Sequence, residues 1–260
     1  MKKYFVIGNP IDHSLSPKLH NYWFKENNIE AIYDKKELNV SDIKEIILDI
    51  KNSKIDGVNV TVPFKKSVIP FLDELTFTAR ETQSVNTIYK KNNKVVGDNT
   101  DVGGFEQSLK HINYSVKNKK VFILGAGGVA PAIIIALKKF GASKIILSNR
   151  TKKKADDLKK IYSYLDIIEW GEVPDFDMII NATSLGLNKT DKIKLNYEDI
   201  GPNKLFYDVI YNPVQTNFLK QAKLLGNKIE NGKMMFIYQA QLSFKIWHGI
   251  LPNVKENLLD

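Results

Sequence analysis

The sequence predicts an α/β protein with two domains, and three observations support this prediction. Apolar segments of strand length alternate with segments in which apolar residues recur at helical spacing, as at Ile43, Ile46, Ile47 and Ile50. Residues 119–154 follow the order strand, glycine turn, helix, strand that is typical of a parallel βαβ unit. The chain has 260 residues, which is enough for two modest domains.

The N-terminal part predicts alternating strands and helices, with a β-hairpin at the edge of the sheet. The expected strands cover 4–7, 31–33 onward, 58–62, 84–89 and 94–98. The turn Asn92-Asn93 joins the last two of these strands. Ser16 before Pro17 suits a helix N-cap, and Ser41 suits the cap of the next helix. Pro63 is expected to end a strand and to open a helix that contains Lys65.

The middle of the chain predicts a Rossmann-like, doubly wound domain that binds a dinucleotide. The apolar strand 121–124 is followed by Gly125-x-Gly127-Gly128-x-Ala130 and by an apolar helix that Gly141 ends. Glycines let the backbone approach a pyrophosphate, and the helix N-terminus offers unpaired N–H groups and a partial positive charge. Further strands are expected at 144–147, 167–168, 178–181 and 205–209, with helices around Asp157 and Phe218.

The end of the strand 144–147 indicates NADP rather than NAD. An NAD site usually has Asp or Glu there, which binds the ribose 2′-hydroxyl. This chain instead has Asn149, Arg150 and Thr151, followed by lysines at 152–154. A guanidinium and a lysine cluster suit a 2′-phosphate, and the chain has only one other arginine, Arg80. At least two of the lysines also fit a solvated first helical turn.

Composition excludes several classes of protein. With no cysteine, the chain has no disulfide framework, cysteine nucleophile or cysteine-ligated zinc, and its four histidines show no paired ligand spacing, so we expect no metal. The net charge is +9, but the lysines are scattered among acids, so no nucleic-acid partner is expected. The apolar segments are too short for a signal peptide or a membrane span. We therefore expect a cytoplasmic enzyme without a membrane partner.

Polar residues in and after the strands of the first domain predict a substrate site. Asn59 and Thr61 should project from one face of the strand 58–62, because strand side chains alternate. A lysine at a helix start gains nothing from the helix dipole, so Lys65 is either solvated or held by an anion such as Asp101. In the second case the lysine can pass a proton to a carbonyl oxygen as a hydride reaches the carbon.

Nine motifs, in order over nearly the whole chain, together resemble the shikimate dehydrogenase family. They are Asn9-Pro-Ile-x-His-Ser-Leu-Ser-Pro17, Asn59-Val-Thr-Val-Pro-Phe-Lys65, Val85-Asn-Thr87, Gly97-Asp-Asn-Thr-Asp101, Gly125-Ala-Gly-Gly128, Asn149-Arg-Thr151, Asn181-Ala-Thr183, Asp208-x-x-Tyr211-x-Pro213 and Tyr238-Gln239. The resemblance implies two α/β domains with the active site in the cleft between them. It also implies reversible NADPH-dependent reduction of 3-dehydroshikimate to shikimate, a step toward chorismate and the aromatic amino acids.

The resemblance also implies a role for individual residues and a domain division. Lys65 and Asp101 are the implied catalytic pair. Substrate contacts are implied for Ser14, Ser16, Asn59, Thr61, Asn86, Asp101, Tyr211 and Gln239. Cofactor contacts are implied for Gly125, Ala126, Gly127, Gly128, Val129, Asn149, Arg150, Thr151, Lys154, Val209 and Gly232. The substrate domain covers 1–101 and the NADP domain 102–237, and the C-terminal helices at about 238–260 pack back onto the substrate domain.

Three departures from the family pattern leave alternatives open. Phe64, Val129 and the segment Thr82-Gln83-Ser84 replace residues that are more usual in relatives, which affects substrate preference and cofactor affinity. One alternative is a quinate/shikimate dehydrogenase with broader cofactor use, and another is a non-catalytic NADP or metabolite sensor. Other reductase classes need a Tyr-x-x-x-Lys motif, zinc ligands or a catalytic cysteine, which the sequence lacks. A monomer and a homodimer both remain possible.

Overall fold

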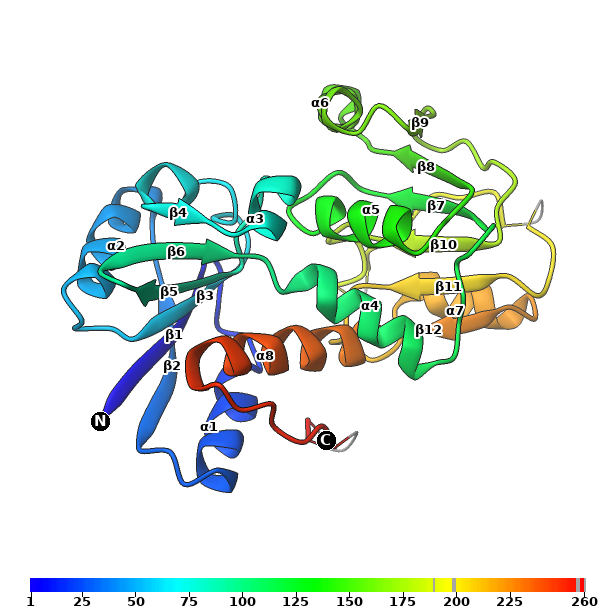
Figure 1. Cartoon of the computed structure of the whole chain (residues 1–260). Coiled ribbons are helices and arrows are strands. Elements are labelled where there is room, and N and C mark those ends of the chain that lie inside the picture. The colour runs from blue at the N-terminus through cyan, green and yellow to red at the C-terminus, as the bar shows by residue number, and fades with distance from the viewer. Residues whose placement is uncertain (189, 198–199, 256–257, 260) are drawn as a thin grey trace. The chain divides into compact units, whose positions relative to one another are not determined.

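The computed structural model describes residues 1–188, 190–197, 200–255 and 258–259. The chain forms two compact units, each with its own six-stranded sheet (Figure 1). Unit 1 consists of Met1–Phe105 and Ile237–Asp260, and unit 2 consists of Glu106–Phe236. Helices α4 (Asp101–His111) and α8 (Lys233–His248) each begin in one unit and end in the other.

Unit 1 contains a mixed sheet in the order β2-β1-β3-β5-β6-β4. Its strands are β1 Lys2–Gly8, β2 Ala31–Glu37, β3 Gly57–Val60, β4 Glu74–Leu75, β5 Thr87–Lys91 and β6 Lys94–Asp98. Strands β1, β2 and β3 run parallel, and β5 and β6 form the expected antiparallel hairpin. The sequence predicted that this hairpin lies at the edge of the sheet. This prediction is wrong, because the short strand β4 pairs with the outer side of β6.

The helices of unit 1 begin at slightly different residues from those predicted. They are α1 Ser16–Glu26, α2 Ile43–Lys51 and α3 Phe77–Thr82, with short 3₁₀ turns at Val40–Asp42 and Ile69–Phe71. Ser16 is the first residue of α1 rather than its N-cap, which is Leu15. Ser41 does not cap α2, because the 3₁₀ turn before α2 is capped by Asn39 and Asp42 through reciprocal hydrogen bonds. The predicted apolar stripe of α2 is buried as expected.

No helix begins at Pro63, contrary to the prediction, and the segment 62–68 is a series of turns. The backbone carbonyl of Lys65 accepts a hydrogen bond from the N–H of Val85 at 2.8 Å. That carbonyl is therefore not used for the helical bond from Ile69, whose N–H donates to Lys66 instead at 3.2 Å. The contact with Val85 fixes the backbone of Lys65 against the segment that leads into β5.

Unit 2 contains a fully parallel sheet in the order β12-β11-β10-β7-β8-β9. Its elements are β7 Lys120–Leu124, α5 Ala130–Lys139, β8 Lys144–Ser148, α6 Lys152–Ile161, β9 Leu165–Ile167, β10 Met178–Asn181, β11 Leu205–Asp208, α7 Asn217–Leu224 and β12 Lys228–Glu230. The strand order reverses between β7 and β10, as in a Rossmann fold, so the predicted fold class is confirmed. Ligands of such sheets bind beyond the carboxyl ends of the strands at that reversal.

The C-terminal part of unit 1 packs against α1. Phe244 of α8 lies 5.7 Å from Trp23 and 5.6 Å from Phe24, measured between ring centroids. After α8 the chain has no further helix among its described residues, although the sequence predicted more than one helix over 238–260. The segment after α8 is held by a hydrogen bond of 3.1 Å from the Trp23 indole to the carbonyl of Asn253. Residues 256, 257 and 260 lie outside the described part.

Candidate active site

Lys65 and Asp101 form a closely spaced ion pair in unit 1. The Lys65 Nζ lies 2.5 Å from Asp101 Oδ2, and the two side chains are only 12% and 6% exposed. Asp101 is the first residue of α4, where the helix dipole favours a carboxylate, and its N–H donates to Asn99 Oδ1 at 3.0 Å. Since water screens the pair only weakly, the carboxylate fixes the position of the ammonium group. The structure thus brings together the two residues that the sequence proposed as a pair.

Asn86 connects this pair to α8. Its Nδ2 donates to Asp101 Oδ1 at 2.8 Å and lies 3.3 Å from Gln239 Oε1. Its Oδ1 accepts from the N–H of Thr100 at 2.8 Å, so the orientation of the amide is determined. Four of the predicted residues, Lys65, Asp101, Asn86 and Gln239, are therefore joined in one polar network.

Asn59 belongs to the same buried network, because its Nδ2 also donates to the carbonyl of Asn86 at 3.1 Å, and two of its other partners were not predicted. The Tyr33 hydroxyl donates to Asn59 Oδ1 at 2.7 Å, and Asn59 Nδ2 donates to Ser243 Oγ at 2.9 Å. Burial raises the pKa of Tyr33 well above its usual value, so the hydroxyl keeps its proton and stays a donor. Tyr33 is 26 residues from Asn59 and Ser243 is 184 residues away, so no local sequence pattern marks either one.

The remaining predicted substrate residues of unit 1 are two serines and a threonine. Ser14 Oγ donates to Ser16 Oγ at 3.2 Å, and both serines are buried. Thr61 lies one residue beyond the end of β3, and its N–H still donates to the carbonyl of Ile7 in β1 at 2.9 Å. Its methyl group covers Gly8, since a Cβ atom at Gly8 would lie 2.6 Å from Thr61 Cγ2.

The glycine turn after β7 has the geometry that close approach to a phosphate needs. Gly125 has φ +106°, and a Cβ atom there would lie 2.9 Å from the carbonyl oxygen of Ala182. Ala126 donates its N–H to Asn149 Oδ1 at 3.0 Å, which ties the turn to the end of β8. Gly127 and Gly128 lead into α5, where Val129 is the N-cap and makes no side-chain cap bond. Among the first residues of α5, Ala130 donates its N–H to the carbonyl of Gly127 at 3.2 Å, Pro131 has no N–H, and Ala132 donates to the carbonyl of Val129 at 3.1 Å. The close approach to a phosphate therefore depends on the glycine turn and on the partial positive charge of the helix N-terminus.

The segment after β8 presents two cations that suit a phosphate. Asn149 Nδ2 donates to the carbonyl of Thr151 at 2.8 Å, which shapes the turn before α6. Lys152 pairs with Glu169, a carboxylate that the sequence analysis did not consider, and Lys153 lies 3.4 Å from Asp157. The side chains of Arg150 and Lys154 are exposed, and neither has a partner among the described residues. These two residues are therefore available to a 2′-phosphate.

Val209 and Gly232, for which the family resemblance implies cofactor contacts, lie close to one another in unit 2, after β11. A Cβ atom at Gly232 would lie 2.1 Å from the carbonyl oxygen of Val209, so only glycine allows this contact. The Val209 N–H donates to the carbonyl of Asn181 at 3.0 Å. The Tyr211 ring stacks on Phe236 with centroids 4.5 Å apart. Tyr211 thus belongs to unit 2, whereas the other predicted substrate residues belong to unit 1.

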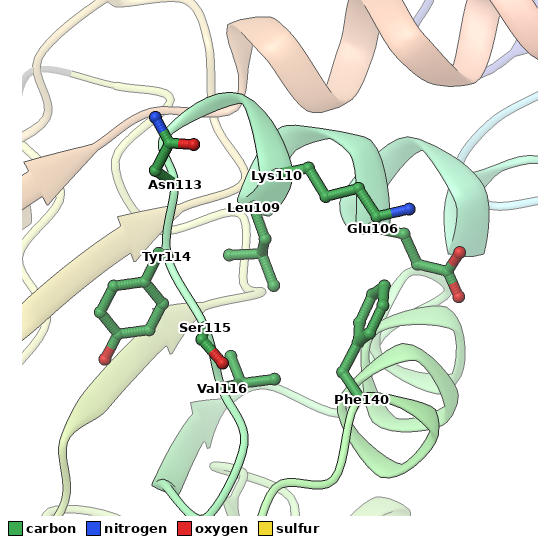
Figure 2. Close-up of a pocket in the computed structure, with 8 residues that line it drawn as sticks. All are labelled: Glu106, Leu109, Lys110, Asn113, Tyr114, Ser115, Val116 and Phe140. Carbon is green, nitrogen blue, oxygen red and sulfur yellow. The ribbon is translucent and has the colours of Figure 1, made fainter.

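Unit 2 also has a pocket of about 420 Å³ that contains none of the predicted residues (Figure 2). It is lined by Glu106, Leu109, Lys110, Asn113, Tyr114, Ser115, Val116 and Phe140. Its loop residues come before β7 and β8, so the pocket lies at the opposite edge of the sheet from the glycine turn. Within the described part of the chain, no group of three or more potential metal ligands occurs, and no helix is long and apolar enough to cross a membrane.

A doubly wound unit with a glycine turn between its first strand and helix, together with a buried lysine–aspartate pair, is typical of nicotinamide-dependent oxidoreductases. Comparison with known proteins identifies the family. Residues 6–88 match the shikimate dehydrogenase substrate binding domain, and residues 107–196 match shikimate / quinate 5-dehydrogenase. The chain belongs to the shikimate dehydrogenase family.

Individual relatives resemble the chain over its whole length. Shikimate dehydrogenase (NADP(+)) of Pelagibacter ubique is 61% identical, with 100% of each chain covered. The crystal structure of shikimate dehydrogenase from Aquifex aeolicus has a TM-score of 0.92 at 39% identity, covering 99% of this chain and 96% of that one. The enzyme of Thermus thermophilus in complex with NADP(H) and shikimate has a TM-score of 0.90 at 29% identity, covering 97% and 95%.

Proposed function

We propose that this chain catalyses the reversible NADPH-dependent reduction of 3-dehydroshikimate to shikimate, with Lys65 and Asp101 as the catalytic pair. The observation that carries this proposal is the buried contact of 2.5 Å between Lys65 Nζ and Asp101 Oδ2. Family membership and the relatives named for this reaction with NADP support the choice of substrate and cofactor. The reaction is one step toward the aromatic amino acids.

Lys65 is the proton donor in this proposal. When bound, NADPH supplies a hydride to the carbonyl carbon of the substrate. Lys65 Nζ gives a proton to the oxygen, which becomes the hydroxyl group of shikimate, and it takes the proton back in the reverse direction. Asp101 holds the ammonium group in place through Oδ2, while its Oδ1 accepts from Asn86.

The other polar residues orient the substrate. Ser14 and Ser16 suit its carboxylate, because hydroxyl groups donate to anions. The ring and its hydroxyl groups are assigned to Asn59, Thr61, Asn86, Asp101, Tyr211 and Gln239. Asn59 and Asn86 are held by several hydrogen bonds each, so their amides are already oriented before the substrate binds.

The cofactor residues all come from unit 2. Gly125, Ala126, Gly127, Gly128 and Val129 would hold the pyrophosphate. Arg150 and Lys154 would bind the 2′-phosphate, with Asn149 and Thr151 shaping the turn. Val209 and Gly232 would line the nicotinamide. We further infer that the protein acts in the cytoplasm as a monomer or homodimer.

Two alternatives differ from this proposal, one in the substrates that the enzyme turns over and the other in whether the protein is an enzyme. The description shikimate / quinate 5-dehydrogenase for residues 107–196 keeps quinate open as a second substrate. The other alternative is a sensor that binds NADP without turnover. The presence of the Lys65–Asp101 pair argues against a sensor, because a non-catalytic protein does not need a proton donor. An absorbance assay at the nicotinamide band with shikimate or quinate, each with NADP or NAD, separates the three. Turnover only with shikimate and NADP supports the proposal, and NADP binding without any turnover supports the sensor.

The catalytic role of Lys65 is tested by Lys65→Ala, with the exposed neighbour Lys66→Ala as the matched control. We expect Lys65→Ala to lower kcat by about 10²-fold or more, the usual size of a general acid–base contribution, with little change in KM. Lys66→Ala should retain normal kcat and KM. If Lys65→Ala raises KM and leaves kcat unchanged, Lys65 binds the substrate and does not transfer the proton.

A further inference from the structure

Asp208 is a buried carboxylate that the proposed reaction does not use. It is the last residue of β11 and is 0% exposed. Its Oδ2 accepts from the Thr216 hydroxyl at 2.6 Å, and its Oδ1 accepts from the N–H of Ile210 at 3.0 Å and from Asn181 Nδ2 at 3.0 Å. Among the described residues, all of these donors are uncharged. A buried carboxylate without a cation costs stability, so its three contacts need an explanation.

Asn181, at the end of β10, extends this network toward the glycine turn. Besides Asp208, its Nδ2 donates to the carbonyl of Leu185 at 3.0 Å. Its Oδ1 accepts from the N–H of Thr183 at 3.0 Å and from the Thr183 hydroxyl at 2.7 Å. The Thr183 methyl group in turn covers Gly125, since a Cβ atom at Gly125 would lie 2.8 Å from Thr183 Cγ2. The contacts therefore run without a gap from Asp208 to the dinucleotide turn.

The network lies at the point where the strand order reverses. Asn181 pairs with Asp208 of β11 on one side and with Leu124 of β7 on the other. The segments that follow these three strands carry Gly125, Thr183 and Val209. Asp208 also holds the segment after its own strand at both ends, through the N–H of Ile210 and the hydroxyl of Thr216, the N-cap of α7.

We propose that Asp208, acting through Asn181, is a positioning residue for the cofactor. It fixes the segments after β10 and β11 in the arrangement that the dinucleotide turn and the nicotinamide residues require. This inference rests on the proposed function, because it assumes that unit 2 binds NADP. Asp208 itself is fully buried, so its effect on the cofactor passes through Asn181, Thr183 and the backbone of Val209.

Two substitutions at Asp208 separate the hydrogen bonds from the volume of the side chain. Asp208→Ala removes all three acceptor contacts. Asp208→Asn keeps two of them, because its amide oxygen can accept from Asn181 and Ile210, and it reverses the third, because its NH₂ group donates to the Thr216 hydroxyl. Asp208→Ser, which retains one hydroxyl, replaces the alanine variant if that variant does not fold.

Tyr207→Phe is the matched control. Tyr207 precedes Asp208 in β11, is 0% exposed, and shares a buried hydrogen bond of 2.8 Å with the Ser108 hydroxyl. Successive side chains of a strand point to opposite faces, so the control deletes a buried hydrogen bond of the same strand on its other face. A general loss of stability in β11 would affect both variants, whereas a loss of positioning affects only Asp208→Ala.

The first measurement is the Kd for NADP by titration calorimetry, with folding checked by circular dichroism. We expect Asp208→Ala to raise Kd by about tenfold, or about 1.4 kcal/mol. Asp208→Asn should stay within about threefold of the wild-type chain, and Tyr207→Phe should match it. A folded Asp208→Ala variant with the wild-type Kd overturns the inference. So does an equal loss of affinity in Tyr207→Phe.

The second measurement is amide hydrogen exchange without cofactor, which does not depend on the proposed function. Asp208→Ala should speed up exchange at the N–H groups of Thr183 and Ile210, and Tyr207→Phe should not. Unchanged exchange in Asp208→Ala overturns the positioning network even if the chain is a dehydrogenase. If Asp208→Ala shows the exchange effect but the wild-type chain binds no NADP, the cofactor role of Asp208 is overturned together with the proposed function, and the network itself remains supported.

Discussion

His20 makes the stability of unit 1 sensitive to acid. Its imidazole is 0% exposed and stacks on the Tyr33 ring at 4.3 Å with an interplanar angle of 3°. Within the described part of the chain, neither Nδ1 nor Nε2 has a hydrogen-bond partner. Burial, and to a smaller extent the nearby His248, lowers the pKa of His20 to about 3. The folded protein therefore keeps this imidazole neutral well below the pH at which the unfolded chain protonates it.

The size of the effect follows from the two pKa values of His20. In the unfolded chain the pKa is about 6.5, so below that pH the unfolded state binds a proton that the folded state does not. Stability is thus lost as the pH falls below about 6.5, and the loss continues to about pH 3. Between pH 7.5 and pH 5 the loss is about 2 kcal/mol. For a chain of this length that corresponds to a fall in Tm of roughly 4–8 °C.

The variant His20→Leu removes this titration with only a small change in side-chain volume. Any constant change in stability drops out when each variant is compared with itself at the two pH values. We expect the fall in Tm between pH 7.5 and pH 5, measured by calorimetry, to be smaller by roughly 4–8 °C in His20→Leu than in the wild-type chain. The exposed His13 provides the control variant His13→Gln, which should follow the wild-type profile. Parallel profiles of His20→Leu and the wild-type chain would refute the reasoning.

Three further predictions concern the proposed cofactor residues of unit 2 and the proposed substrate residues of unit 1. Gly125→Ala should destabilise unit 2 by about 1–3 kcal/mol and weaken NADP binding, because φ is +106° and the new Cβ meets backbone; chemical denaturation and titration measure both effects. Arg150→Ala should weaken NADPH much more than NADH in fluorescence titrations, whereas Arg80→Ala should affect neither, and equal weakening would remove the 2′-phosphate role. Tyr33→Phe leaves Asn59 Oδ1 without its donor, so kcat/KM for shikimate should fall about 5- to 100-fold, and an unchanged value contradicts that role.

Features that depend on residues close together in the sequence could be predicted from the sequence. The apolar strand β7, the glycine turn and α5 follow one another within 20 residues (120–139), and each is recognisable from its own composition. The absence of a carboxylate directly after β8 predicted NADP for the same reason. The pairing of Lys65 with Asp101 was also proposed, although its distance and burial were not available from the sequence.

The predicted bounds of helices and strands were wrong where a segment distant in the sequence competes for backbone hydrogen bonds. The expected helix after Pro63 does not form, because the carbonyl of Lys65 accepts from Val85, 20 residues further along the chain. Strand β4 was missed because its two residues have too little sequence to show a period, and only pairing with β6 makes them a strand.

The sequence alone determined the fold class and the family, and it proposed the residues that contact the ligands, because these depend on local patterns and short motifs. Only the tertiary structure decided how those residues are held. Tyr33 and Ser243 are hydrogen-bonded to Asn59, and Asp208 is hydrogen-bonded to Asn181. Glu169 forms an ion pair with Lys152. Each of these contacts joins residues 17 or more positions apart, and whether they meet depends on the packing of whole strands and helices.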